Sequence, residues 1–288
     1  MARFQEPVND DDPILKRDMK QTEQKQKQLV HDKIAIPLTP AQSSRARLLE
    51  VLRNNLSSCG ATIINGRAGT GKTTLTADFA RGSGRAVSWY KVDAADFELR
   101  EFMKYLLESL SLQRPSIDPD LILRSTDSVP SHRAELAAES LVFKLSERNA
   151  EPLLVVIEDL HLVYDADWVV PFFYRLLSLL PADVHVLITC RSMPPAPLWR
   201  LRSKQMLRVM DEAELAFTLE ETVRLFESHG LSEEHARIAI YQTNGRASGI
   251  ANFVSTPGRA GRAWADSFLA ISPRRIKSFT GQTPDFQT

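Results

Sequence analysis

The chain has 288 residues, and its 36 lysines and arginines balance 36 aspartates and glutamates to a formal net charge of zero. This balance excludes the global positive charge that attracts nucleic acid, so we expect no direct DNA binding by this chain. The longest apolar runs are too short to span a membrane, the polar N-terminus excludes a secretion signal, and two distant cysteines exclude a disulfide framework. A cytoplasmic protein without membrane contacts is therefore expected.

The N-terminal region divides into a polar segment and an apolar segment that precedes a helix. Residues 1–33 are rich in Asp, Lys and Gln and have too few apolar side chains to offset the entropy of ordering, so we expect a disordered or loosely helical tail. Residues 34–40 are apolar but contain two prolines, which favours an extended segment. Apolar residues between positions 48 and 56 then recur at helical spacing and predict an amphipathic helix.

A glycine-rich loop follows a short buried strand. Residues 61–65 are apolar and β-branched, residues 66–73 fit the P-loop pattern G-x-x-x-x-G-K-[ST], and residues 74–80 return to helical spacing. Strand, glycine loop and helix are the context that this phosphate-binding motif needs, which disfavours a simple glycine-rich turn. The residues expected to bind the nucleotide are Gly66, Arg67, Ala68, Gly69, Thr70, Gly71, Lys72, Thr73 and Thr74.

The residue types in this loop explain its chemistry. Its glycines let the backbone bend around an anion, and the amides of the loop and of the first helical turn can then point at the phosphates. Lys72 adds a mobile positive charge for the β- and γ-phosphates. The Thr73 hydroxyl is an oxygen ligand of the kind that Mg²⁺ prefers.

Strands and helices alternate through the rest of the core. Apolar runs predict strands at 85–92, 153–157 and 184–190 and a short strand at 206–209, with helical stripes at 99–110, 134–145 and 168–180. Continuous apolar strands suit a parallel sheet that is covered on both faces. We therefore predict an α/β fold of the P-loop NTPase class, with a parallel sheet flanked by helices, over residues 34–212.

Charged residues follow two of these strands, at the edge where parallel sheets bind ligands. Glu158 and Asp159 follow one strand and Arg191 follows the next. One carboxylate can hold Mg²⁺ while the other orients or deprotonates an attacking water. We expect Thr73 and Glu158 to hold the metal, and Glu158, Asp159 and Arg191 to form the catalytic set. Taken alone, these residues would be equally compatible with solvated strand ends.

The pattern changes after residue 212. Thr218 and Glu221 form a capping box, Gly230 is a suitable helix stop, and Ser232 can cap a second helix. We expect a small C-terminal helical lid over residues 213–253. An irregular basic tail, without a convincing helix-turn-helix pattern, is expected over residues 254–288.

Several segments between residues 34 and 250 together resemble one family. They are 66–74, 87–93 with Asp96, 155–161, 187–191, 201–202, and 215–218 with Glu221. In this order they resemble the ATPase module of STAND signalling ATPases, specifically the MalT-like group of large ATP-binding LuxR-type transcription regulators. The resemblance implies ATP as the nucleotide, Arg191 as a sensor arginine, residues 36–37 near the adenine, and slow hydrolysis that serves a switch.

Three departures from the family pattern bear on function. Glu158 stands where the family usually has Asp, which concerns Mg²⁺ affinity and hydrolysis. Residues 244–247 stand where relatives carry a Gly-Trp-Pro-like turn. The sequence also ends soon after this turn, so we expect the DNA-binding domain of full-length relatives to be absent from this chain.

The predicted function is an ATP-binding, slowly hydrolysing signal-transduction switch module of a LuxR/MalT-like transcription regulator. Its expected ligands are ATP, ADP and Mg²⁺, and self-association in the ATP state stays open. One alternative is a stand-alone, AAA-like oligomeric ATPase, which needs an arginine supplied across a subunit interface. A second is a non-catalytic nucleotide-binding adaptor. ATP turnover separates the adaptor from the other two, and nucleotide-driven ring formation marks the oligomeric ATPase.

Overall fold

The computed structural model of this chain describes residues 31–39, 45–126, 132–146 and 151–255. Its centre is a five-stranded parallel sheet with the strand order β2-β3-β4-β1-β5. The strands are β1 (Ala61–Asn65), β2 (Ala86–Lys91), β3 (Leu153–Glu158), β4 (Val184–Cys190) and β5 (Leu207–Met210). The predicted architecture, a parallel sheet flanked by helices, is confirmed.

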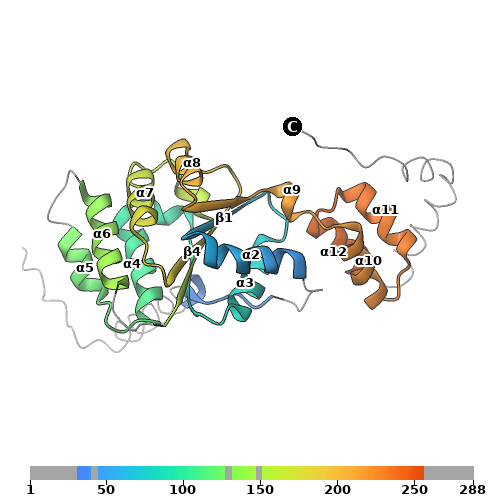
Figure 1. Cartoon of the computed structure of the whole chain (residues 1–288), viewed down its shortest axis with the longest axis horizontal. Coiled ribbons are helices and arrows are strands. Elements are labelled where there is room, and N and C mark those ends of the chain that lie inside the picture. The colour runs from blue at the N-terminus through green and yellow to red at the C-terminus, as the bar shows by residue number, and fades with distance from the viewer. Residues whose placement is uncertain (1–30, 40–44, 127–131, 147–150, 256–288) are drawn as a thin grey trace, which may run out of the picture.

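Helices cover both faces of the sheet (Figure 1). One face packs against α2 (Ala46–Ser58) and α3 (Lys72–Gly82). The other packs against α4 (Leu99–Ser111), α5 (Pro119–Thr126), α6 (Arg133–Leu145), α7 (Val169–Leu179) and α8 (Ala196–Ser203). None of the helices within the described ranges has both the length and the apolar character needed to cross a membrane.

The apolar strands fill both cores because successive side chains of a strand point to opposite faces. In β3, Val155 and Ile157 belong to the core under α4–α8, whereas Leu154 and Val156 belong to the core under α2 and α3. All six residues of β3 are buried. Two short 3₁₀ helices, η1 (Ala94–Phe97) and η3 (Leu160–Val163), follow β2 and β3 at the carboxyl edge of the sheet.

The chain beyond β5 forms a separate group of helices. After α9 (Glu212–Leu215) come α10 (Leu219–Ser228), α11 (Glu233–Thr243) and α12 (Ala247–Ser255), which we call the lid. Figure 1 shows the lid at the end of the molecule opposite α5 and α6. Its own apolar cluster includes Phe217, Phe226 and Ile250. The Thr218 hydroxyl accepts a hydrogen bond from the Glu221 amide, as a capping box requires.

The structure differs from the sequence-based boundaries at both ends. Residues 31–34 are helical, which at 31–33 is the loosely helical alternative expected for the tail, whereas Ile34 was expected in an extended segment. Lys33 explains this order, because its ammonium pairs with Asp93 at 2.7 Å and with Asp96 at 2.6 Å. At the other end, α12 continues to Ser255, two residues into the predicted basic tail. The rest of both predicted tails, residues 1–30 and 256–288, lies outside the described residues.

Candidate functional site

The P-loop turns from β1 into α3 at the carboxyl edge of the sheet. The Gly66 amide donates to the Cys190 carbonyl at 3.1 Å, which ties the start of the loop to the end of β4. Gly69 and Gly71 have φ angles of +80° and +86°, a conformation that side chains with a Cβ adopt at a cost. The turn therefore requires glycine at these two motif positions, and α3 begins immediately after it at Lys72.

Lys72 lies folded into the loop rather than in solvent. Its ammonium donates hydrogen bonds to the carbonyl of Gly66 and, at 2.9 Å, to the carbonyl of Arg67. The side chain is buried, and burial lowers the pKa of Lys72, although nearby Asp159 opposes that shift. A buried ammonium whose hydrogen-bond acceptors are the neutral carbonyls and, at 3.5 Å, the Thr70 hydroxyl is a ready partner for an anion, because a phosphate would offset its loss of hydration.

Thr73 and Glu158 meet at the first turn of α3. The Thr73 hydroxyl donates to Oε1 of Glu158, a side chain that is only 3% exposed. Burial raises the pKa of Glu158, and the Thr73 hydrogen bond partly counteracts this shift. The pair offers one hydroxyl and one carboxylate, which fits Mg²⁺ because this ion usually combines one or two protein oxygens with substrate phosphates.

No group of three or more His, Cys, Asp or Glu side chains in the described parts of the chain could hold a metal ion by itself. Mg²⁺ in phosphoryl-transfer sites is usually held by one or two protein oxygens together with substrate phosphates and water. Thr73 and Glu158 thus suit an ion that arrives with a nucleotide.

Asp159 occupies a sharp turn directly after β3. Its φ of +58° is left-handed, a conformation that Asp tolerates better than most residues. The backbone amide donates to the Thr189 hydroxyl at 3.0 Å, which fixes this turn against β4. The carboxylate lies 3.4 Å from Nε of Arg191 and 3.8 Å from Nδ1 of His161. Asp159 is therefore held between two neighbouring strand ends.

The structure brings the three predicted catalytic residues to one edge of the sheet, beside the P-loop. Arg191 is half-exposed and paired with Asp159, so its guanidinium has access to solvent and to a ligand. His161, to which the sequence assigned no role, faces the same carboxylate. Burial lowers the pKa of His161, and Arg191 and Lys72 add to this effect, whereas Asp159 opposes it.

The lid contacts the outer side of the P-loop, a feature that sequence reasoning missed. The Ser248 amide donates to the Gly69 carbonyl at 2.8 Å, and the Arg246 guanidinium donates to the Ala68 carbonyl. A Cβ added to Gly71 would lie only 3.1 Å from the methyl group of Ala247. The start of α12 is thus seated directly on the loop. The only sequence signal was the unusual turn at 244–247, which carried no information about its partner.

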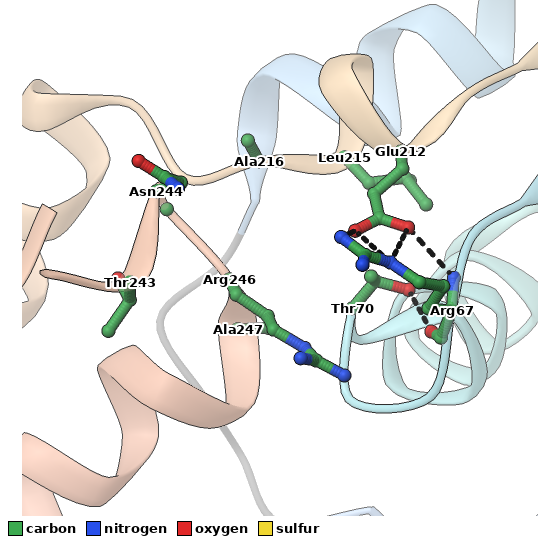
Figure 2. A pocket seen from close by; sticks show the side chains of 10 residues that line it. Arg67, Thr70, Glu212, Leu215, Ala216, Thr243, Asn244, Arg246 and Ala247 are labelled. Atoms are coloured by element: carbon green, nitrogen blue, oxygen red, sulfur yellow. Dashed lines mark hydrogen bonds and ion pairs between the residues drawn. The ribbon is translucent and has the colours of Figure 1, made fainter.

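Beside this contact, the P-loop is also bound to α9. Figure 2 shows the Arg67 guanidinium facing the Glu212 carboxylate, with Arg246 approaching the loop from α12. The loop, α9 and the turn before α12 enclose a cavity of about 180 Å³. Its lining residues include Arg67, Thr70, Glu212, Asn244 and Arg246.

The N-terminal segment lies along α3. The Arg81 guanidinium donates to the Pro37 carbonyl and, at 2.9 Å, to the Thr39 hydroxyl. Ile36 packs against the apolar core between α2, α3 and the sheet. Residues 36–39 are therefore attached to the helix that begins with Lys72, and the expected position of residues 36–37 near the adenine stays a prediction.

Comparisons with known proteins connect this geometry to a family. A sequence model described as the AAA ATPase domain matches residues 42–189. The HTH-type transcriptional regulator MalT of Serratia proteamaculans (strain 568) is 30% identical over 185 residues, which is 64% of this chain and 20% of that protein. MalT of Yersinia enterocolitica is 27% identical over 239 residues, covering 81% of this chain and 24% of that protein. The predicted resemblance to MalT-like regulators is confirmed, and the chain spans about a quarter or less of their length.

Two solved structures also align with this chain. The Walker-type ATPase PABY2304 of Pyrococcus abyssi has a TM-score of 0.47 and 13% identity, over 83% of this chain and 80% of that chain. AMPPCP-bound DnaA from Aquifex aeolicus has a TM-score of 0.44 and 14% identity, over 81% of this chain and 68% of that chain.

Proposed function

This chain belongs to the family of AAA ATPase domains, and from this premise we propose that it is an ATP-binding, slowly hydrolysing switch module of a MalT-like transcription regulator. In this proposal the P-loop and α3 bind the phosphates of ATP. The lid senses whether the third phosphate is present. The regulator's DNA-binding activity is the output that this switch would control.

The contact between α12 and the P-loop is the observation that carries this proposal. The Gly69 and Ala68 carbonyls accept hydrogen bonds from Ser248 and Arg246, so phosphate-binding residues and lid share one stretch of backbone. A ligand shifts a conformational equilibrium only if it binds the two conformations differently. The backbone amides that would bind phosphate and the backbone carbonyls that bind the lid belong to the same loop. A change in how the loop holds phosphate therefore alters how it holds the lid.

The proposed chemistry uses the groups at the strand ends. Lys72 neutralises charge on the β- and γ-phosphates, and Arg191 approaches the γ-phosphate from β4. Asp159 orients the attacking water and accepts its proton. Thr73 and Glu158 hold Mg²⁺, which when bound neutralises charge on the phosphate oxygens.

Slow turnover is consistent with the pairing of Asp159 and Arg191. Their 3.4 Å contact holds back the arginine that would stabilise the transition state. Fast phosphoryl transfer needs such a positive charge free to act on the γ-phosphate. A switch benefits from this restraint, since the ATP state must outlast the signal that it reports.

Calorimetry with ATP and ADP and single-turnover hydrolysis by the purified chain test the proposal. Asp159→Asn is expected to slow hydrolysis while ATP binding survives. Wild-type turnover faster than about 10 s⁻¹, a median enzyme rate, would contradict a slow switch. Binding without any turnover would favour the adaptor, and rings that form only with ATP would favour the AAA-like oligomeric ATPase.

A further inference from the structure

The most exposed part of the P-loop, residues 67–69, is held by a carboxylate from outside the motif. Oε2 of Glu212 accepts the Arg67 backbone amide at 3.0 Å. The same carboxylate accepts the Arg67 guanidinium, from Nε at 3.0 Å and from Nη2 at 2.7 Å. Glu212 therefore binds Arg67 through its backbone as well as its side chain (Figure 2).

The other backbone group of Arg67 is also occupied. Its carbonyl accepts the Thr70 hydroxyl at 2.9 Å and the Lys72 ammonium at 2.9 Å. Both peptide planes at Arg67 are thus fixed, the first by Glu212 and the second by the motif itself. Removing Glu212 would release the first plane and leave the amide to solvent.

Glu212 can act as an anchor because its own helix is fixed to the core. The Asp211 carboxylate caps α9 by accepting the Glu214 amide at 3.0 Å. Leu215 is buried and belongs to the core under α2 and α3. The Arg45 guanidinium, preceding α2, donates to the Leu215 carbonyl at 2.8 Å. These contacts place Glu212 at the end of a short, well-supported helix.

The charges around Glu212 keep it ionised. The Arg67 side chain and backbone hydrogen bonds lower the pKa of Glu212 to about 2, and Arg246 of the lid adds to this effect. The carboxylate is consequently available as an acceptor across the physiological pH range. It is bonded to the P-loop arginine and lies near enough to the lid arginine, Arg246, to feel its charge.

We propose that Glu212 is a positioning residue that pre-orders the Arg67 peptide plane of the P-loop for nucleotide binding without touching the nucleotide. An ordered loop loses less conformational entropy when it closes around phosphates, so affinity rises. This inference rests on the proposed nucleotide site but not on the switch. Because the β-phosphate is common to both nucleotides, the benefit applies to ATP and ADP alike.

Three alanine variants separate this role from that of an ordinary surface ion pair. Glu212→Ala removes both the amide and the guanidinium contacts, whereas Arg67→Ala removes only the guanidinium. The control is Glu214→Ala, on the same helix, which loses a comparable 2.7 Å pair with Arg208 but no contact with the loop. Affinities for ATP and ADP are measured by calorimetry with Mg²⁺, and melting temperatures verify folding.

We expect Glu212→Ala to weaken ATP and ADP binding equally by about tenfold, as the loss of a charge-assisted hydrogen bond would. Arg67→Ala should weaken it by about threefold or less, because exposed ion pairs contribute little. Glu214→Ala should match the wild type. The KM for ATP should rise in Glu212→Ala with kcat unchanged, because the interaction is the same in the ground and transition states. Glu212→Gln, which retains an amide acceptor, should recover part of the affinity.

Equal losses of nucleotide affinity in Glu212→Ala and Arg67→Ala would show that the side-chain ion pair accounts for the whole effect of Glu212. That result would overturn the inference. So would an unchanged affinity in Glu212→Ala when the wild type binds normally. Failure of the wild type to bind either nucleotide would instead overturn the nucleotide site itself, and this inference with it. A loss confined to ATP would contradict pre-ordering, because it would indicate a contact with the γ-phosphate.

Discussion

Gly245 lies where the joint between sheet and lid leaves no room for a side chain against the backbone of Phe217. Its φ is +73°, and a Cβ placed there would lie 2.6 Å from the Phe217 carbonyl oxygen and 2.9 Å from the Phe217 amide nitrogen. The Phe217 amide also donates to the Gly245 carbonyl at 2.8 Å. Gly245→Ala must therefore push apart two backbone segments that hydrogen-bond to each other.

Gly230 provides a matched control within the lid. Its φ of +70° is nearly the same, but a Cβ there would meet nothing within 4 Å. Each substitution adds about 1 kcal/mol for placing alanine in the left-handed region. Gly245→Ala also loses a hydrogen bond worth about 1 kcal/mol and adds crowding of about 1–3 kcal/mol. We expect a total of about 3–5 kcal/mol for Gly245→Ala and about 1 kcal/mol for Gly230→Ala.

Native-state hydrogen exchange measures these costs as opening free energies of α10–α12, where local and global unfolding are resolved. Gly245→Ala should accelerate exchange throughout the lid by at least about 30-fold relative to Gly230→Ala, with the core under α4–α8 unchanged. Similar exchange in both variants would refute the reasoning. It would mean that the backbone around Phe217 shifts to accommodate the added methyl group without destabilising the lid.

Other predictions concern single residues. Lys72→Ala should lower ATP affinity at least about 100-fold without destabilising the fold, because burial already penalises its charge; calorimetry and thermal melting check both parts. Arg191→Ala should reduce the difference between ATP and ADP affinities, and retention of the wild-type ratio would remove Arg191 from the γ-phosphate. Burial lowers the pKa of His185 to about 4, so the unfolded chain binds a proton that the folded chain does not between pH 6.5 and 4. As the pH falls from 6.5 to 4, the free energy of unfolding should therefore decrease by about 1.4 kcal/mol per pH unit. In urea denaturation, the plot of this free energy against pH for His185→Leu should lack that contribution.

The central elements of the fold were accessible from sequence because each leaves a local signal. The continuous apolar run of β3 indicates a strand buried on both faces, and the P-loop pattern requires a strand before it and a helix after it. Capping residues such as Thr218 mark a helix start within four positions of sequence. The carboxyl-edge positions of Glu158 and Arg191 follow from the parallel arrangement alone.

Long-range polar contacts left no such signal. Arg67 and Glu212 are separated by 145 residues, and Arg246 and Ala68 by 178 residues, so only the folded chain brings them together. The order at Lys33 likewise depends on Asp93 and Asp96, which lie about 60 residues further along the chain. Local composition around Lys33 favours disorder, and two ion pairs with a distant loop outweigh it. The strand order and the packing of the lid on the P-loop likewise depend on contacts between distant residues, which leave no local signal in the sequence.

Hydrogen exchange of residues 218–255 with saturating ATP, with ADP and without nucleotide tests the switch most directly, using the Asp159→Asn variant so that ATP persists. The account predicts that ATP slows exchange at the start of α12, around Ser248, by about tenfold or more relative to ADP, because the loop that binds the γ-phosphate also accepts the Ser248 amide. Identical exchange in the ATP and ADP states, with both nucleotides shown to be bound, would contradict it. The lid would then be a fixed cover for the site.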